Sequence, residues 1–358
     1  MRATNIARAL AGVTSSAMVL VACAGPGGVT QETGPVTLHV MNFANYMPDD
    51  IAERFKAATG HTIELTLTSS NEDAVTKLDA SPAGTYDIAF VTNPFAEGLN
   101  NAGQLEQLDH SKIPNLANLY PEATQIASDP GNKFSIPYSW GTTGICYRSD
   151  LVTETTIDSW NDLLQPSVEL KDKITMMDED RWLMIPALKV LGFSANSTDA
   201  DELNAAADLL IEAKKTLLGY DAETFYTKLD SGEALAVHAW DGWCNYVQDP
   251  STVKFVVPKE GSDLFVDTMV IPKGSPHLEA AHQFIDFILK PENGQWVAEN
   301  ILYKVPNKAA MDALDPALLE TYPNMAITPA ELLKQESLRD LGEGQTRFTD
   351  AATRVKAQ

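Results

Sequence analysis

The residues best suited to bind a small molecule are several aromatic side chains and one carboxylate. Phe43 and Tyr46 lie at the end of the first apolar segment, Trp240 follows a later one, and Tyr303 comes after two predicted helices. Asp267 stands inside an apolar run, where an unpaired carboxylate would be costly. Aromatic faces attract cations and cover methylene chains, at about 0.5–2 kcal/mol for each good contact. A carboxylate beside them selects an ammonium group, so the set favours a small amine, with plain core packing as the alternative for each aromatic residue.

Motifs for other chemistry are missing from the sequence. It has no G-x-S-x-G elbow, no H-E-x-x-H pair and no glycine-rich phosphate loop, and its six histidines lack metal-ligand spacing. One of them, His238, lies in a predicted buried strand. A tyrosine pair that could hold ferric ion is also absent. We therefore predict no enzymatic activity, no catalytic residue, no metal and no cofactor.

The charge of the chain argues against some partners. The 358 residues carry a formal net charge of −23, with 44% hydrophobic and 21% charged residues. An acidic surface repels phosphate backbones, so we expect no nucleic-acid partner, and it favours a cationic ligand. The alternative is a generic acidic surface that only keeps the protein soluble. No internal stretch approaches the apolar length needed to cross a bilayer.

The N-terminus has the features of a lipoprotein signal peptide. Arg2 and Arg8 precede an apolar, small-residue run that ends in Leu20-Val21-Ala22-Cys23, which looks like a lipobox. We predict a signal peptide over 1–22, lipidation of Cys23, and a glycine-rich flexible tether over 23–35. The protein would then be exported and anchored by lipid, facing the periplasm or the cell exterior. An ordinary secretory signal with a chance cysteine is the alternative.

The two remaining cysteines, Cys146 and Cys244, form an even pair in an exported chain. Such a pair suggests a disulfide in an oxidising compartment. Two separate buried thiols are the alternative, because sequence supplies no geometry to decide.

Hydrophobic patterning predicts an α/β fold. Strand-like and helix-like segments alternate from 34 to 91, in the β-α-β-α-β order of a parallel, doubly wound sheet with ligand groups at strand ends. The later elements that we predict are strands at 144–147 and 234–239 and helices at 181–191, 201–216, 278–289 and 292–300.

Several motifs, in one order along the chain, resemble those of the bacterial extracellular solute-binding proteins of spermidine/putrescine (polyamine) ABC transporters. The resemblance covers roughly residues 36 to 350. Its motifs are Asn42-Phe43-Ala44-Asn45-Tyr46, Ser70-Asn71-Glu72, Gly84-Thr85-Tyr86-Asp87-Ile88, Ile136-Pro137-Tyr138-Ser139-Trp140-Gly141, Val257-Pro258-Lys259-Glu260-Gly261 and Pro306-Asn307.

The resemblance implies a type II periplasmic-binding-protein-like fold, with two doubly wound lobes, a hinge and a ligand cleft. We assign 36–144 plus 268–311 to lobe 1 and 145–267 plus 312–358 to lobe 2. It also implies a monomer that delivers its ligand to the permease subunits of an ABC importer.

The resemblance also implies the ligand-binding residues. Trp240, Asp267 and Tyr303 match family positions, and Glu179 falls near an acid of the second lobe. The full expected set is Phe43, Asn45, Tyr46, Thr92, Glu179, Trp240, Phe265, Asp267 and Tyr303.

Some positions depart from the family. Phe43 and Phe265 replace tryptophans, Asn45 replaces a glutamate that holds one ammonium, Trp182 replaces another acid, and Leu338 replaces a glutamine. We therefore expect a ligand with one dominant ammonium, or a short diamine, to be preferred over spermidine.

Other ligands remain open at the level of sequence. A zwitterionic amine such as an amino acid, a GABA-like compound or a betaine would suit the loss of one acid. Its carboxylate would need an arginine, and Arg148 and Arg181 are the nearest candidates. A ferric ion is a remote alternative.

Overall fold

The structure, a computed structural model, describes residues 34–358. The predicted signal peptide, Cys23 and nearly all of the predicted tether lie outside the described residues. Residues Pro35–Gln358 form one compact unit. Within residues 34–358, no helix combines the length and the apolar character that crossing a bilayer requires.

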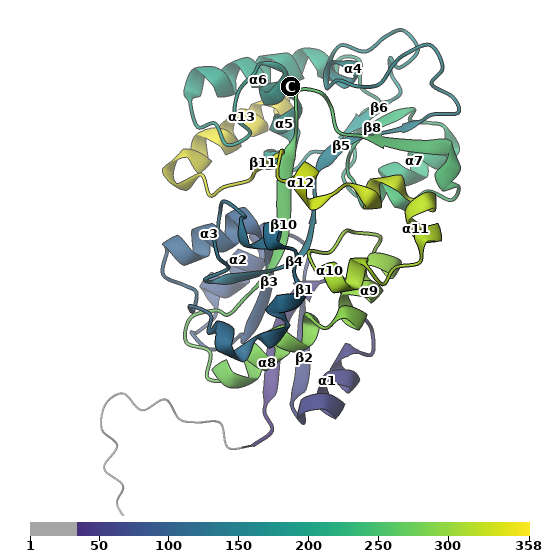
Figure 1. The fold of residues 1–358 in the computed structure, drawn as a ribbon. Helices are drawn as coiled ribbons and strands as arrows, with labels where there is room; N and C mark the ends of the chain where they lie inside the picture. Colours follow the sequence, from purple (N-terminus) through teal and green to yellow (C-terminus); the bar gives the residue numbers. More distant parts are fainter. Residues whose placement is uncertain (1–33) are drawn as a thin grey trace, which may run out of the picture. The chain divides into compact units, whose positions relative to one another are not determined.

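The unit contains two β-sheets (Figure 1). The first has the order β11-β10-β3-β1-β2, with β4 paired to β10, and the second has the order β7-β6-β8-β5-β9. The strands of the first sheet are β1 (Thr37–Phe43), β2 (Thr62–Thr68), β3 (Ile88–Thr92), β4 (Ser135–Gly141), β10 (Asp263–Val270) and β11 (Glu336–Ser337). Those of the second are β5 (Thr143–Arg148), β6 (Ile174–Met176), β7 (Gly219–Tyr220), β8 (Ala236–Trp240) and β9 (Val253–Val256).

The helices include those predicted at 181–191, 201–216, 278–289 and 292–300, and others that the sequence did not predict. They are α1 (Ile51–Thr59), α2 (Asn71–Ala80), α3 (Asn93–Asn101), α4 (Asn161–Leu164), α5 (Asp180–Val190), α6 (Ala200–Lys214), α7 (Phe225–Ser231), α8 (Leu278–Ile288), α9 (Pro291–Asn300), α10 (Lys308–Met311), α11 (Pro316–Thr321), α12 (Pro329–Leu332) and α13 (Gln345–Ala357). Figure 1 shows α5, α6 and α13 together beside the second sheet, and α1 and α8 beside the first.

The first β-α-β-α-β segment shows how sequence dictates these elements. In the first sheet β1 is parallel to both β2 and β3, which confirms the predicted doubly wound order. Helix α1 buries Ile51 and Phe55, and Gly60 ends it with φ +85°, a conformation that glycine adopts readily. Pro48 lies before the helix, and its carbonyl accepts a hydrogen bond from the Ile51 amide.

One large buried cluster contains residues from strands of both sheets and from helices α1, α5, α6, α8 and α13. Strand β3 is buried at every position, as expected for a strand covered on both faces. Phe55 of α1 packs edge-on against Phe284 and Phe287 of α8, with ring centroids 5.4 Å apart in both pairs. These contacts join two of the helices that lie beside the first sheet.

The chain passes between the two sheets in direct connections. Strand β4 of the first sheet leads to β5 of the second through Thr142, and a short loop after β9 leads back to β10. The lobe boundaries that we assigned, 36–144 plus 268–311 and 145–267 plus 312–358, stay a prediction.

A disulfide joins Cys146 on β5 to Cys244, with Cα atoms 5.8 Å apart. Cys244 lies in a 3-10 helix, Trp243–Tyr246, directly after β8. The bond is buried and ties this short helix to the second sheet.

Candidate functional site

A cavity of about 620 Å³ is lined by residues from the ends of strands in both sheets. The structure brings all of the predicted ligand residues to its walls. These are Phe43, Asn45, Tyr46, Thr92, Glu179, Trp240, Phe265, Asp267 and Tyr303. Their location in one cavity is a structural fact, and their role as ligand groups stays a proposal.

Asp267 lines the cavity, belongs to a network of hydrogen-bonded polar groups, and is only 9% exposed. Its carboxylate accepts hydrogen bonds from the Tyr46 hydroxyl at 2.5 Å, the Thr92 hydroxyl at 2.8 Å and the Ser139 hydroxyl at 3.2 Å. Burial raises the pKa of the Asp267 carboxyl above its ordinary value, and these hydrogen bonds oppose that rise. All three donors are neutral, so dipoles rather than a countercharge stabilise the carboxylate.

Three neighbouring strands place this carboxylate and its donors. Asp267 lies on β10, directly opposite Thr92 at the end of β3 and opposite Ser139 on β4. The pairing of β10 with β4 shifts register between Asp267 and Thr268. Such an irregularity re-aims a side chain, and here it lies at the residue that points its charge toward the cavity.

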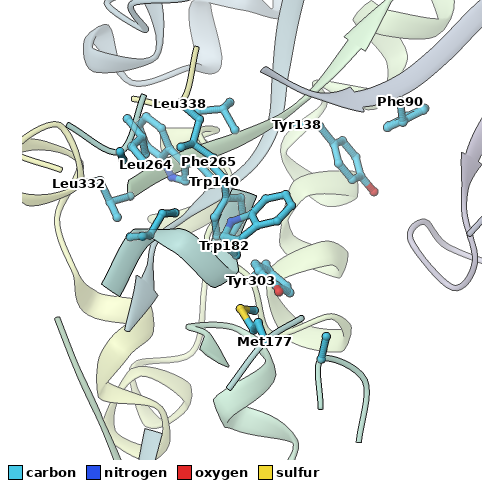
Figure 2. Close-up of a cluster of buried hydrophobic side chains, with 14 of the residues drawn as sticks. Phe90, Tyr138, Trp140, Met177, Trp182, Leu264, Phe265, Tyr303, Leu332 and Leu338 are labelled. Atoms are coloured by element: carbon cyan, nitrogen blue, oxygen red, sulfur yellow. The ribbon is translucent and has the colours of Figure 1, made fainter. Parts of the chain in front are cut away.

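Aromatic rings form another part of the wall. Trp182 and Trp240 meet edge-to-face with centroids 5.6 Å apart, and Phe265 and Tyr303 do so at 6.0 Å. In Figure 2, Trp182, Phe265 and Tyr303 are part of a cluster of buried hydrophobic side chains, so each ring both packs in the core and presents a surface to the cavity. Core packing and a ligand wall are therefore compatible roles for these residues. 

Comparison of the sequence with known proteins identifies the family. The sequence profile described as "Bacterial extracellular solute-binding protein" matches residues 50–327. The chain is 30% identical to the spermidine/putrescine-binding periplasmic protein of Salmonella typhimurium over 325 residues, which is 90% of this chain and 92% of that protein. The chain belongs to the spermidine/putrescine-binding family of bacterial extracellular solute-binding proteins.

Two further relatives agree with this assignment. The putrescine-binding periplasmic protein of Escherichia coli is 30% identical over 292 residues, 76% of this chain and 79% of its own. A solved structure of a putative spermidine/putrescine ABC transporter protein from Listeria monocytogenes superimposes with a TM-score of 0.80 at 30% identity, covering 89% of this chain and 98% of its own. The fold is therefore the expected periplasmic-binding-protein fold, and the family is one of binding and transport proteins rather than enzymes.

Sequence reasoning missed several residues of this solute-binding protein's cavity. Trp182 and Trp243 were given no ligand role, but both line it. Tyr246, Glu72 and Glu223 line it as well. Glu72 belongs to a motif that carried the family resemblance, which was the one available signal, whereas nothing local marks Tyr246 or Glu223. 

Leu338, which stands in place of a family glutamine, is fully buried in the hydrophobic cluster and does not line the cavity (Figure 2). Asn45 does line it, with a left-handed backbone (φ +56°) that asparagine tolerates better than most residues.

Arginines that could hold a carboxylate ligand lie elsewhere. Arg148 pairs with Asp150 and Arg181 donates to the Arg339 carbonyl and to Asn196. Neither lines the cavity. The hypothesis that Arg148 or Arg181 binds the carboxylate of a ligand in this cavity is therefore wrong.

A second acidic residue of the cavity wall is Glu179, which directly precedes α5. The Glu179 side chain is exposed to the cavity, but the surrounding walls displace enough water to raise the pKa of its carboxyl to about 8. Repulsion from Asp178, Glu72 and Glu223 contributes to this rise. Within residues 34–358 no group of three acidic, histidine or cysteine side chains is arranged to hold a metal ion.

The raised pKa of Glu179 gives a pH dependence for cation binding. Since this carboxyl is mostly protonated below pH 8 and ionised above it, affinity for an amine should rise as pH increases through that value. An alkyl ammonium, with a pKa of about 10.4 as in lysine, stays charged over most of that range. We expect a gain of roughly tenfold between about pH 7 and 9, measured by calorimetry with putrescine. Glu179→Gln should give a flat profile, and a flat wild-type profile would contradict a ligand contact at Glu179.

Proposed function

We propose that this protein binds a small cationic amine of the polyamine type in its cavity and delivers it to the permease of an ABC importer. The observation that carries the proposal is the charge of the cavity wall. Among residues 34–358, those lining the cavity include four carboxylates, Glu72, Glu179, Glu223 and Asp267, and no lysine, arginine or histidine. An anionic wall without countercharge favours a ligand that brings its own positive charge.

The aromatic rings support the same ligand class. Trp240, Phe265 and Tyr303 are apolar surfaces of the right kind to cover a methylene chain and to attract an ammonium group. The names of the relatives from Salmonella and Escherichia coli, which include spermidine and putrescine, agree with this chemistry. The protein would act as an exported monomer.

One observation favours a second candidate, a zwitterionic amine. The indole N–H of Trp182 is buried and has no hydrogen-bond partner among residues 34–358. Trp182 also lines the cavity, so a ligand acceptor such as a carboxylate oxygen could satisfy this donor. A GABA-like compound, an amino acid or a betaine has one cation and one such acceptor.

A thermal-shift screen distinguishes the two candidates. Putrescine, cadaverine, spermidine, GABA, glycine betaine and amino acids should be tested at equal concentration. A ligand present at about 100 times its Kd stabilises the folded state by about 2.7 kcal/mol, which is a readily measured shift. We expect the diamines to give the largest shifts. A largest shift with GABA or betaine would favour the zwitterion, and a shift only with sugars or anions would contradict the proposal.

We further propose that Cys23 carries the lipid that anchors the protein. The lipobox-like Leu20-Val21-Ala22-Cys23 and the glycine-rich segment after it motivate this. Cys23→Ser should release the protein from the membrane fraction or leave it unprocessed. The double variant Cys146→Ser/Cys244→Ser is the matched control, since it removes the other cysteines and should stay in the membrane fraction. Membrane association of Cys23→Ser equal to wild type would contradict the anchor.

A further inference from the structure

A buried ion pair lies directly behind the aromatic wall. Lys304 and Asp241 are in contact, and their side chains are only 3% and 0% exposed. Each follows a wall residue in the chain, since Trp240 precedes Asp241 and Tyr303 precedes Lys304. Neither charged residue lines the cavity. The pair is therefore close to the ligand site but outside it.

The pair is one of several contacts that hold the segment 301–304, here called the docked segment, against the residues after β8. The Asn245 side-chain amide donates to the Leu302 carbonyl at 3.1 Å, and the Tyr246 hydroxyl donates to the Ile301 carbonyl at 2.8 Å. The disulfide fixes the same 3-10 helix to the second sheet. The docked segment thus rests on a rigid support.

The packing at this contact is close and partly strained. A Cβ atom on Gly242 would lie 2.6 Å from ring atoms of Tyr303, so only glycine allows the ring to lie there. Leu302 has a φ of +58°, a left-handed conformation unfavourable for a leucine. Such a conformation persists only where surrounding contacts determine it.

The backbones of the same two residues also bond to the passage between the two sheets. The Lys304 carbonyl accepts from the Trp140 amide at 3.1 Å, and the Asp241 amide donates to the Thr142 carbonyl at 3.2 Å. Trp140 lies near the end of β4, and Thr142 connects β4 to β5. The residues that follow Trp240 and Tyr303 are therefore both tied to this passage.

We propose that Asp241 and Lys304 are positioning residues of the ligand site, which hold Tyr303 at a fixed distance from Trp240 and so determine how well the wall fits a bound amine. The inference rests on the proposed function, because the wall matters as an amine-binding surface. Removing one partner leaves the other charge buried and unpaired, which is strongly unfavourable. The double variant Asp241→Asn/Lys304→Met leaves no unpaired charge and is expected to fold.

The first measurement needs no ligand. Amide hydrogen exchange of the peptide that covers the docked segment should become about tenfold faster in the double variant, because local opening is no longer opposed by the ion pair. The double variant Lys189→Met/Glu336→Gln is the matched control. It removes a partly buried ion pair whose residues do not line the cavity, and exchange in the docked segment should be unchanged. Unchanged exchange in the double variant overturns the proposal.

The second measurement tests whether the pair acts through Tyr303. In the wild-type background, the double variant should weaken putrescine binding roughly three- to a hundred-fold, the range found for coupled neighbours. In a Tyr303→Ala background, the same double change should have little further effect. If the double change weakens putrescine binding by the same factor in the Tyr303→Ala background as in wild type, the positioning role is overturned. If wild type binds no amine, the proposed function fails, and the exchange measurement still decides whether the pair holds the docked segment.

Discussion

Asp267→Asn should weaken binding of the preferred amine by about ten- to a hundred-fold, since a charge-assisted hydrogen bond contributes roughly 1.5–3 kcal/mol. Asparagine preserves the size of the side chain, and its one carbonyl oxygen can still accept from either Tyr46 or Thr92, which donate to different carboxylate oxygens of Asp267, but it lacks the charge. Calorimetry with putrescine, spermidine, GABA and a betaine would measure the change. A neutral ligand should lose far less than a cationic one.

The unliganded variant should be at least as stable as wild type near neutral pH. Burial raises the pKa of the Asp267 carboxyl, so the folded state favours its protonated form and loses stability as the pH rises through the normal aspartate range. Replacing the charge by an amide removes that unfavourable contribution. Weaker binding together with unchanged or greater stability would separate a ligand role from a structural one.

Asp263→Asn is a matched control on the same strand. Asp263 is fully buried on β10, with its carboxylate hydrogen-bonded to Thr143 and Ser262, and it does not line the cavity. Its replacement should leave affinity unchanged. If Asp267→Asn binds as tightly as wild type, Asp267 is not the ammonium anchor. If spermidine binds best, our interpretation of Asn45 and Trp182 is wrong while the transport role stands.

The elements that sequence predicted well are those with strong local signals. Helix α5 and the strands β3 and β8 have long apolar patterns, and Gly192 has a φ of +77°, as expected of a glycine just beyond the end of α5. The first residue of α1 has a weaker signal, because Pro48 and the two acids that follow it are compatible both with the first turn of a helix and with the segment before one. The local sequence therefore predicts the type of each element better than the residue at which the element begins.

The cavity residues that sequence missed lack a local signal. Tyr246 and Trp243 lie in a 3-10 helix whose position depends on a disulfide to β5, a contact across 98 residues. Glu223 lines the same cavity as Glu72, although the two residues lie far apart in the sequence. Asp267 could be predicted because a charged residue in an apolar strand is costly wherever the strand lies. The ion pair of Asp241 and Lys304 has no such mark, since both residues follow aromatic residues in ordinary polar contexts.

His238 should make the protein sensitive to acid. Its ring is fully buried on β8 and meets Trp160 edge-to-face at 5.0 Å, and neither ring nitrogen has a hydrogen-bond partner within residues 34–358. Burial lowers the pKa of this imidazole to about 3, from about 6.5 in an unfolded chain. Between these two values the unfolded state binds more protons, so stability is complete above about pH 6.5 and falls as the pH decreases toward 3.

His238→Leu should remove this loss. At pH 5 the difference in proton binding amounts to roughly 2 kcal/mol, at 1.36 kcal/mol per pKa unit. Urea unfolding at pH 8 and pH 5 should therefore show the wild type losing about 2 kcal/mol more than the variant between the two conditions. His39→Gln is the control, since its side chain is 44% exposed on β1 and should not alter the pH dependence by a comparable amount. Equal losses in wild type and His238→Leu would mean that the buried ring does not govern acid stability. In that case the protonation of other groups, such as carboxylates in buried ion pairs, must account for any unfolding at low pH, because replacing the imidazole leaves those groups untouched.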